Sequence, residues 1–183
     1  MANIFIFHGI FGHPKENWYD WLKIKLEEKG HKVIVPKFPT PEDQTLENWM
    51  KVLFEYKEFI NKDSIFIGHS LGVAFALSVL EEIKINKAYF ISGFIGKIGN
   101  EFDPINAPLV GKDFKWDLIK SNCNSFTMIH SDTDPYVKIE KAIEIATHLE
   151  VNIILVPNAG HFNEAAGYTK FEMLLNLIVK PKH

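Results

Sequence analysis

Residues 64–83 read SIFIGHSLGVAFALSVLEEI, and this stretch decides the fold that the sequence predicts. An apolar run at 64–67 precedes the pentapeptide GHSLG, and an apolar helical run follows it. A serine at a sharp turn between a strand and a helix is typical of a nucleophile elbow, in which a strained backbone lifts the hydroxyl above the sheet edge. Glycines stand two positions before and two after Ser70, where such a turn leaves no room for a Cβ atom. The pattern predicts a nucleophilic serine, and the alternative is an ordinary tight turn.

The composition is that of a soluble globular protein. The chain has 183 residues, of which 46% are apolar and 23% charged, and its formal net charge is −3. This length predicts a single domain over residues 1–183. The charge balance argues against a nucleic-acid or membrane partner. The apolar run at 4–7 is too short for a signal peptide or a membrane span, so we expect a cytoplasmic protein. Cys123 is the single cysteine, which excludes an internal disulfide.

Short apolar runs alternate with longer amphipathic ones along the chain. The short runs are rich in Ile, Val and Phe and apolar on both faces, as in a parallel sheet that is covered on both sides. We expect strands at Asn3–Phe7, His31–Val35, Ser64–Gly68, Lys87–Ser92, Ser125–His130 and Val151–Val156. We expect helices at Asn17–Lys29, Leu46–Ile60, Leu71–Ile83, Lys112–Ser121, Lys138–Leu149 and Tyr168–Val179. This repetition predicts a doubly wound, right-handed α/β sandwich.

Two stretches interrupt the alternation. Residues 36–44 contain three prolines and are predicted to form a loop. Residues 93–111 carry glycines and prolines near both ends, with apolar residues throughout. A loop of this length inside a compact domain is usually functional or mobile. We expect it either to pack irregularly on the core or to form a flap that faces the substrate.

A nucleophilic serine needs a base that takes its proton and a carboxylate that orients the base. His161 follows the sixth expected strand, where the base of such a site belongs. The carboxylate should follow the fifth, where residues 131–137 read SDTDPYV. Asp132 and Asp134 both fit this spacing. Asp134 is preferred because Asp-Pro turns the chain back and can place Val137 in the core, whereas Asp132 is better suited to cap the turn through its own backbone amides.

The oxyanion of an acyl-transfer reaction needs backbone N–H donors. One donor should be the amide of Leu71, which follows the nucleophile at a helix N-terminus. The other should come from the loop at 8–12, where Ile10 is the preferred donor and Phe11 the alternative. We expect the substrate pocket to be lined by His8, Gly9, Phe11, Phe94 and Phe162.

Metal and cofactor motifs are absent from the sequence. His8 and His13 lie five residues apart in a loop, and there is neither an H-E-x-x-H pattern nor a cysteine pair. The chain contains neither G-x-G-x-x-G nor a P-loop. We therefore predict no metal and no cofactor.

The chain resembles the small serine hydrolases of the retinoblastoma-binding protein 9 and YdeN family, within the α/β-hydrolase superfamily. The motifs that carry the resemblance run in order over nearly the whole chain: His8-Gly9, Asn17-Trp18-Tyr19-Asp20-Trp21-Leu22, Pro36-Lys37-Phe38-Pro39, Glu47-Asn48-Trp49, Gly68-His69-Ser70-Leu71-Gly72, Ser92-Gly93-Phe94, Asp134-Pro135-Tyr136-Val137 and Gly160-His161-Phe162. The pair Trp18 and Trp21 is more distinctive than the elbow, although as packing it would simply bury one helix face.

The resemblance implies a minimal α/β-hydrolase fold, a three-layer sandwich with a six-stranded parallel sheet in the order 2-1-3-4-5-6 and no cap domain. It also implies that Ser70 is the nucleophile, His161 the base and Asp134 the acid. Binding to the retinoblastoma protein through Leu-x-Cys-x-Glu is not transferred, because serines stand two positions before and after Cys123.

The leading functional hypothesis is a carboxylesterase-like serine hydrolase. It would cleave a small ester, thioester or activated amide through an acyl-enzyme on Ser70. One alternative is a catalytically silent binding protein that keeps the hydrolase fold, and the other is an acyltransferase that uses the same three residues.

Overall fold

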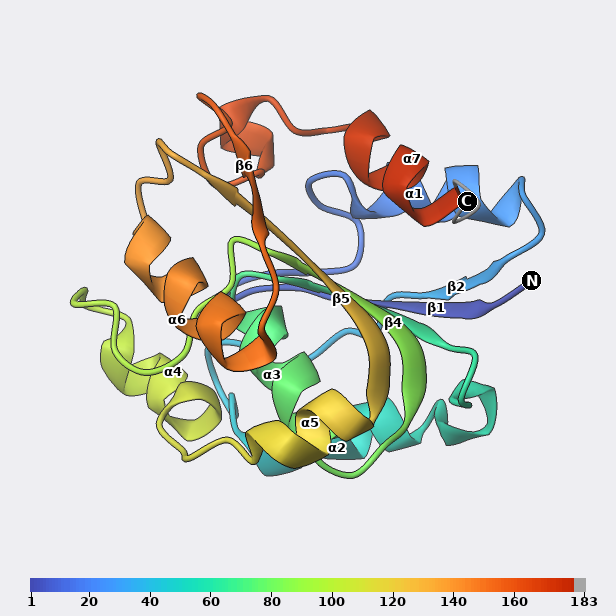
Figure 1. The fold of residues 1–183 in the computed structure, drawn as a ribbon, viewed down its shortest axis with the longest axis horizontal. Coiled ribbons are helices and arrows are strands. Elements are labelled where there is room, and N and C mark those ends of the chain that lie inside the picture. The colour runs from blue at the N-terminus through green and yellow to red at the C-terminus, as the bar shows by residue number, and fades with distance from the viewer. Residues whose placement is uncertain (180–183) are drawn as a thin grey trace.

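The computed structural model of the protein describes residues 1–179 (Figure 1). Within them, six strands form one parallel sheet in the order β2-β1-β3-β4-β5-β6, as the resemblance implied. The strands are β1 (Asn3–Phe7), β2 (Lys32–Ile34), β3 (Ile65–His69), β4 (Ile85–Ile91), β5 (Cys123–Ser131) and β6 (Ile153–Val156). All six lie within two residues of the expected positions at one end or both.

Helices cover both faces of the sheet and complete three layers. Helices α1 (Tyr19–Glu27) and α7 (Glu172–Val179) lie together on one face (Figure 1). The opposite face carries α2 (Leu46–Phe54), α3 (Leu71–Leu80), α5 (Trp116–Ser121) and α6 (Ile139–Leu149). Helix α4 (Asp103–Val110) packs beside α3, and short 3-10 turns occur at Lys57–Phe59 and Glu164–Ala166. Within the described residues the chain inserts no cap domain.

The two faces of each strand enter different hydrophobic clusters. In β1, Ile4 and Ile6 point toward α1 and α7, whereas Phe5 and Phe7 point toward α3. All four side chains are buried. The two-residue period of a strand sends alternate side chains to opposite faces. The strand sequences are therefore apolar throughout because each face is covered.

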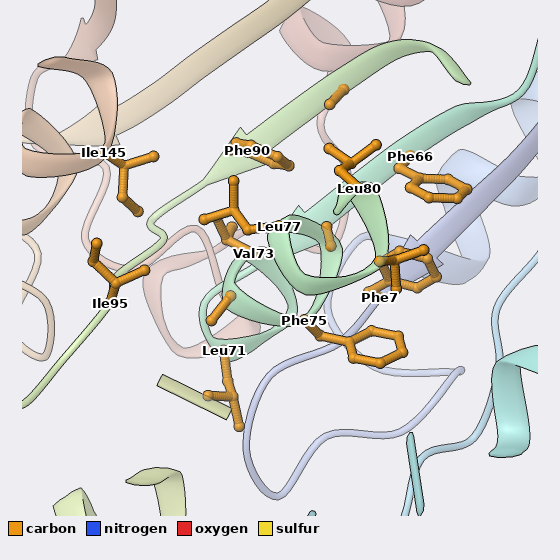
Figure 2. Packing of buried hydrophobic residues seen from close by; sticks show 14 of the residues in the cluster. Phe7, Phe66, Leu71, Val73, Phe75, Leu77, Leu80, Phe90, Ile95 and Ile145 are labelled. Atoms are coloured by element: carbon orange, nitrogen blue, oxygen red, sulfur yellow. The ribbon is translucent and has the colours of Figure 1, made fainter. Parts of the chain in front are cut away.

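Helix α3 lies at the centre of the larger cluster. All ten of its residues are buried, and a helix that is apolar on every side must be enclosed. Figure 2 shows Val73 and Leu77 below Phe90, and Leu80 beside Phe66. The elbow serine immediately precedes this helix, so a fully buried helix positions the nucleophile predicted from the sequence.

The stretch 93–111 contains a helix that the sequence analysis did not predict. Helix α4 holds two prolines, which led us to expect a loop. Pro104 lies in the first helical turn, where an N–H would have no helical partner, and Pro108 removes only one further donor. Leu109 and Val110 are buried against the core and offset that loss.

Several helix boundaries differ from those expected. The second helix ends at Phe54 rather than Ile60, although Thr45 caps it as expected by accepting from the Asn48 amide (3.1 Å). The fourth expected helix, α5, begins at Trp116 rather than Lys112, and α7 begins at Glu172 rather than Tyr168. No helix among residues 1–179 combines the length and apolar character that crossing a membrane requires.

Replacing Gly72 with alanine should severely destabilise the protein. A Cβ atom at this position would lie 2.2 Å from the carbonyl oxygen of Phe7 and 2.8 Å from that of His8, so α3 would have to move away from β1. We expect G72A to lower the free energy of unfolding by about 3 kcal/mol or more. Urea titration followed by tryptophan fluorescence measures this loss.

The control is G99A, because a Cβ atom on Gly99 has no heavy atom within 4 Å. Its positive φ of 86° should cost about 1 kcal/mol. Equal losses in the two variants would contradict the role of close packing at Gly72.

Candidate active site

Ser70 occupies a strained turn between β3 and α3. Its φ and ψ angles are 56° and −122°, a conformation that non-glycine residues rarely adopt. A Cβ atom on Gly68 would lie 2.9 Å from backbone atoms of Gly72 and Val73, so the glycine before the turn is required for the steric reason expected. The loop after β1 also lies against the serine, because a Cβ atom on Gly9 would be 3.3 Å from Ser70 Oγ.

Asp134 and His161 come together from two neighbouring loops at the carboxyl edge of the sheet. The Nδ1 atom of His161 lies 2.7 Å from Oδ2 of Asp134, and the aspartate side chain is almost fully buried. Oδ1 of Asp134 accepts from the amides of Tyr136 (2.9 Å) and Val137 (3.0 Å). Since a carboxylate only accepts, Nδ1 carries a hydrogen, and in the neutral ring Nε2 is then the atom with the lone pair.

The hydrogen bonds also keep Asp134 ionised. Burial alone would raise the pKa of this carboxyl group, but the hydrogen bond and charge of His161, together with the two amides, lower the pKa below its usual value. Asp132 has a different role, since its Oδ1 accepts from the amide of Asn158 (2.8 Å) in the next loop. We expected Asp132 to cap its own turn, and this was wrong. Its hydrogen-bond partner is the amide of Asn158, which follows β6.

Ser70 and His161 line the same cavity, which has a volume of about 420 Å³. Gly9, Phe11 and Phe94 line it as expected, and so does Ile10. The stretch 93–111, expected either to pack on the core or to face the substrate, also contributes Ile98, Asn100, Phe102 and Asn106 to the wall. Other lining residues were not expected from the sequence, and these are Glu16, Asn17, Tyr19, His69, Tyr136, Val137 and Asn163.

A family model described as serine hydrolase matches residues 4–180. The chain belongs to the serine hydrolase family. This assignment agrees with a fold that sets a strained serine and an aspartate-bound histidine around one cavity.

Two curated proteins are similar to this serine hydrolase over most of their length. The hydrolase YdeN of Bacillus subtilis (strain 168) is 24% identical over 179 residues, which span 96% of this chain and 93% of that protein. Serine hydrolase RBBP9 of Rattus norvegicus is 24% identical over 162 residues, which span 88% and 84% of the two chains.

Solved structures show the same fold. The crystal structure of the ydeN gene product from B. subtilis has a TM-score of 0.90 at 22% identity and covers 97% of both chains. Est1E from Butyrivibrio proteoclasticus has a TM-score of 0.70 at 19% identity, covering 98% of this chain and 89% of that one.

Two of the pocket residues expected from the sequence do not line the cavity of this serine hydrolase. His8 is fully buried beneath the loop, where its Nδ1 donates to the carbonyl of Gly9 (2.8 Å) and its Nε2 accepts from the amide of Phe38 (3.1 Å). Phe162 has a positive φ of 51°, and its ring stacks on Phe171, away from the cavity. The expectation was wrong because the sequence does not reveal which way these loop side chains point.

A chain of polar contacts, exposed at Phe11 and buried at Asn106, supports the loop that carries Ile10. The Phe11 amide donates to Thr40 Oγ1 (2.9 Å), and that hydroxyl donates to Gln44 Oε1 (2.6 Å). Gln44 Nε2 in turn donates to the side-chain oxygen of Asn106 (3.2 Å) on α4. The predicted loop at 36–44 thus contains neither helix nor strand and connects two parts of the cavity wall.

The other titratable groups do not form a metal-binding cluster. Among residues 1–179, no group of three or more His, Cys, Asp or Glu side chains could hold a metal ion. Cys123 is buried, and burial raises the pKa of its thiol to about 11.

Acid should destabilise this serine hydrolase through two buried histidines. Burial lowers the pKa of His8 to about 4 and that of His69 to about 3, whereas both titrate near 6.5 in the unfolded chain. Below pH 6.5 the unfolded chain therefore binds protons that the folded protein excludes. The free energy of unfolding should fall between pH 6.5 and pH 4, by up to about 1.4 kcal/mol per pH unit for each histidine.

Urea unfolding at pH 7, 6, 5 and 4.5 measures this slope. The variant H8Q retains an acceptor for the Phe38 amide but does not titrate. Its free energy of unfolding should therefore fall less steeply with pH, by up to about 1.4 kcal/mol per pH unit. A stability that stays constant from pH 7 to pH 5 would show that neither histidine is buried in the neutral form.

Proposed function

We propose that this serine hydrolase cleaves small carboxylic esters, thioesters or activated amides through an acyl-enzyme on Ser70. One observation carries the proposal: His161, whose Nδ1 is held by Asp134 at 2.7 Å, shares its cavity with the strained serine. A nucleophile, a base and an orienting carboxylate are the three groups that acyl transfer to serine requires.

The proposed reaction proceeds in two steps. Ser70 Oγ attacks the substrate carbonyl carbon while Nε2 of His161 takes the hydroxyl proton, and Asp134 stabilises the imidazolium. The tetrahedral intermediate then expels the leaving group, which receives that proton from Nε2. In the second step, His161 removes a proton from water, the resulting hydroxide attacks the acyl carbon, and Ser70 regains its proton as the acid is released. Transfer to an acceptor other than water would use the same residues.

Two main-chain amides are suited to hold the oxyanion. The amide of Leu71 is at the N-terminus of α3, where the helix dipole favours negative charge. The amide of Phe11 is already directed at Thr40, which supports Ile10 as the second donor. Both assignments follow the sequence expectation.

The cavity supports an uncharged acyl or leaving group of modest size. Its wall is mainly apolar and aromatic, with amide groups at intervals. Of the described residues that line it, Glu16 is the one with a carboxylate, and none is lysine or arginine. An anionic substrate would therefore have no countercharge there. The cytoplasmic location, the single domain and the absence of nucleic-acid or membrane partners stay predictions from the sequence.

Labelling with a fluorophosphonate probe tests the proposed chemistry, because the probe reacts with a serine that a base has activated. We expect the folded protein to be labelled at Ser70, and we expect S70A and heat-denatured protein to remain unlabelled. S121A is the matched control, since Ser121 is exposed on α5, and it should be labelled normally. D134N should lower kcat for p-nitrophenyl acetate by about 10³- to 10⁴-fold because the imidazole loses its required tautomer.

A folded wild-type protein that is not labelled would contradict the proposal and favour a silent binding protein. Labelling that persists in S70A would show that a residue other than Ser70 is the nucleophile.

The polar chain behind the oxyanion loop should also affect turnover. T40V removes the acceptor for the Phe11 amide at nearly constant volume, so the neighbouring Ile10 amide should lose its fixed position. We expect kcat to fall about tenfold with little change in KM, as for a misplaced oxyanion donor. T40S keeps the hydroxyl and should retain most of the activity. Equal kcat values for T40V and wild type would contradict the prediction. Either the Ile10 amide is then not an oxyanion donor, or its loop does not need the hydrogen bond to Thr40.

A further inference from the structure

The segment at the start of α1, Asn17 to Tyr19, contacts the loop that carries His161. The sequence singled out this stretch for its aromatic residues, which as packing would only bury a helix face. In the structure its side chains instead make polar contacts that lead to the main chain of residues 161–164, two of them directly and one through His69. Nothing in the chemistry proposed above uses this segment.

Two of these contacts are direct. Oδ1 of Asn17 accepts from the amide of Glu164 (2.8 Å), and Nε1 of Trp18 donates to the carbonyl of Phe162 (2.9 Å). The tryptophan is fully buried, and its ring packs edge-on against Phe171 of the same aromatic cluster. The segment therefore holds the loop through its main chain, at Phe162 and Glu164.

The third contact reaches His161 itself through His69. The hydroxyl of Tyr19 lies 2.6 Å from Nδ1 of His69, and Nε2 of His69 lies 2.8 Å from the carbonyl oxygen of His161. A carbonyl only accepts, so Nε2 of His69 must carry the hydrogen. In a neutral ring Nδ1 then has the lone pair, and Tyr19 donates to it. The chain of hydrogen bonds thus runs in one direction, from Tyr19 to the main chain of His161.

Burial keeps both members of this chain neutral. Burial, together with the nearby His161, lowers the pKa of His69 to about 3, and burial raises the pKa of Tyr19 far above its usual value. Both side chains are buried, so the loss of a donor leaves an acceptor unsatisfied at a cost. With His69 neutral, the hydrogen on Nε2 and the hydrogen of the Tyr19 hydroxyl are each placed by these two hydrogen bonds.

The loop that bears the base needs external support because its backbone is strained. Asn158, Gly160 and Phe162 all have positive φ angles, between 51° and 55°. Non-glycine residues persist in this region only where surrounding contacts enforce it. Asp134 fixes the His161 ring through Nδ1, but it does not fix the main chain from which that ring extends.

We propose that Tyr19, His69 and Trp18 are positioning residues that hold the main chain at 161–162, and thereby the base, in register with the nucleophile. The proposal rests on the function proposed above for Ser70 and His161. His69 directly precedes the serine, so one covalent linkage and one hydrogen bond join the nucleophile to the base. The proposal thus gives a function to His69, the residue before the serine in G-x-S-x-G, and to the aromatic residues Trp18 and Tyr19 at the start of α1.

Tyr19→Phe tests the proposal, because it removes only the hydroxyl that fixes the hydrogen positions of His69. We expect kcat for p-nitrophenyl acetate to fall about tenfold while KM changes less than about twofold, since a slightly misplaced base slows the chemical step and the aromatic ring of residue 19 stays in the cavity wall. The rate of fluorophosphonate labelling at Ser70 should fall by the same factor. Both are measured at a temperature where all variants are folded.

Tyr89→Phe is the matched control. Tyr89 is also a buried tyrosine facing the α1 and α7 layer. Its hydroxyl likewise donates one hydrogen bond, here to the main-chain carbonyl of Leu177 (3.1 Å) rather than to a histidine ring. Its partner lies in α7 rather than in the loop of His161. We expect Y89F to keep the wild-type kcat while losing about as much stability as Y19F.

Substitutions at His69 provide a second, independent measurement. H69L removes the donor to the His161 carbonyl and should lower kcat by about 100-fold. H69Q places an N–H donor at similar reach, so its kcat should be about tenfold higher than that of H69L. If H69L does not fold, W18F removes the donor to Phe162 while keeping an aromatic ring, and it should lower kcat about fivefold.

The outcomes separate the two proposals. If the wild type is labelled at Ser70 but Y19F and Y89F have the same kcat, the positioning role is overturned and the proposed hydrolase chemistry stands. If H69Q recovers nothing relative to H69L, or W18F retains full kcat, the contacts serve stability alone. If the wild type is not labelled at all, both proposals fall.

Discussion

The close approach of α3 to β1 is the constraint on which the rest of the structure depends. The backbone of Gly72 passes so near the carbonyl of Phe7 that no side chain fits between them. Helix α3 is consequently enclosed on every side, and the chain must turn sharply from β3 to enter it. The unfavourable backbone conformation of Ser70 follows from that turn. Core packing and the strained conformation of Ser70 are therefore two results of one steric condition.

The site combines residues whose positions have different origins. Ser70 is placed by dense hydrophobic packing, which tolerates little displacement. Asp134 and His161 lie in loops, and their positions depend on hydrogen bonds to main-chain groups and to one another. In a packed core, side chains are held in place by steric contacts on all sides. In the loops, hydrogen bonds must fix the position of each group. That difference accounts for the many buried polar side chains on the side of the site where the base lies.

Much of the fold could be predicted from the sequence, because strands that are buried on both faces and helices with glycine or capping signals have local patterns. Thr45 shows this, since its capping role is legible in the sequence and present in the structure. Helix α4 escaped prediction because the benefit of burying Leu109 depends on distant residues, while the cost of Pro108 is local. The directions of His8 and Phe162 escaped for a related reason. Loop side chains point where hydrogen bonds and positive φ angles direct them, and neither is encoded in a simple period.

The connection between β4 and β5 contributes much of the cavity wall, through Phe94, Ile98, Asn100, Phe102 and Asn106. The nucleophile, the acid, the base and the oxyanion donors proposed here all come from other connections. In the proposed function, chemistry and selection are therefore carried by separate segments of the chain. Drift or exchange in residues 93–111 can alter which molecules are accepted while the reacting groups keep their places, so a lineage built on this scaffold could diversify its substrates without reinventing its reaction.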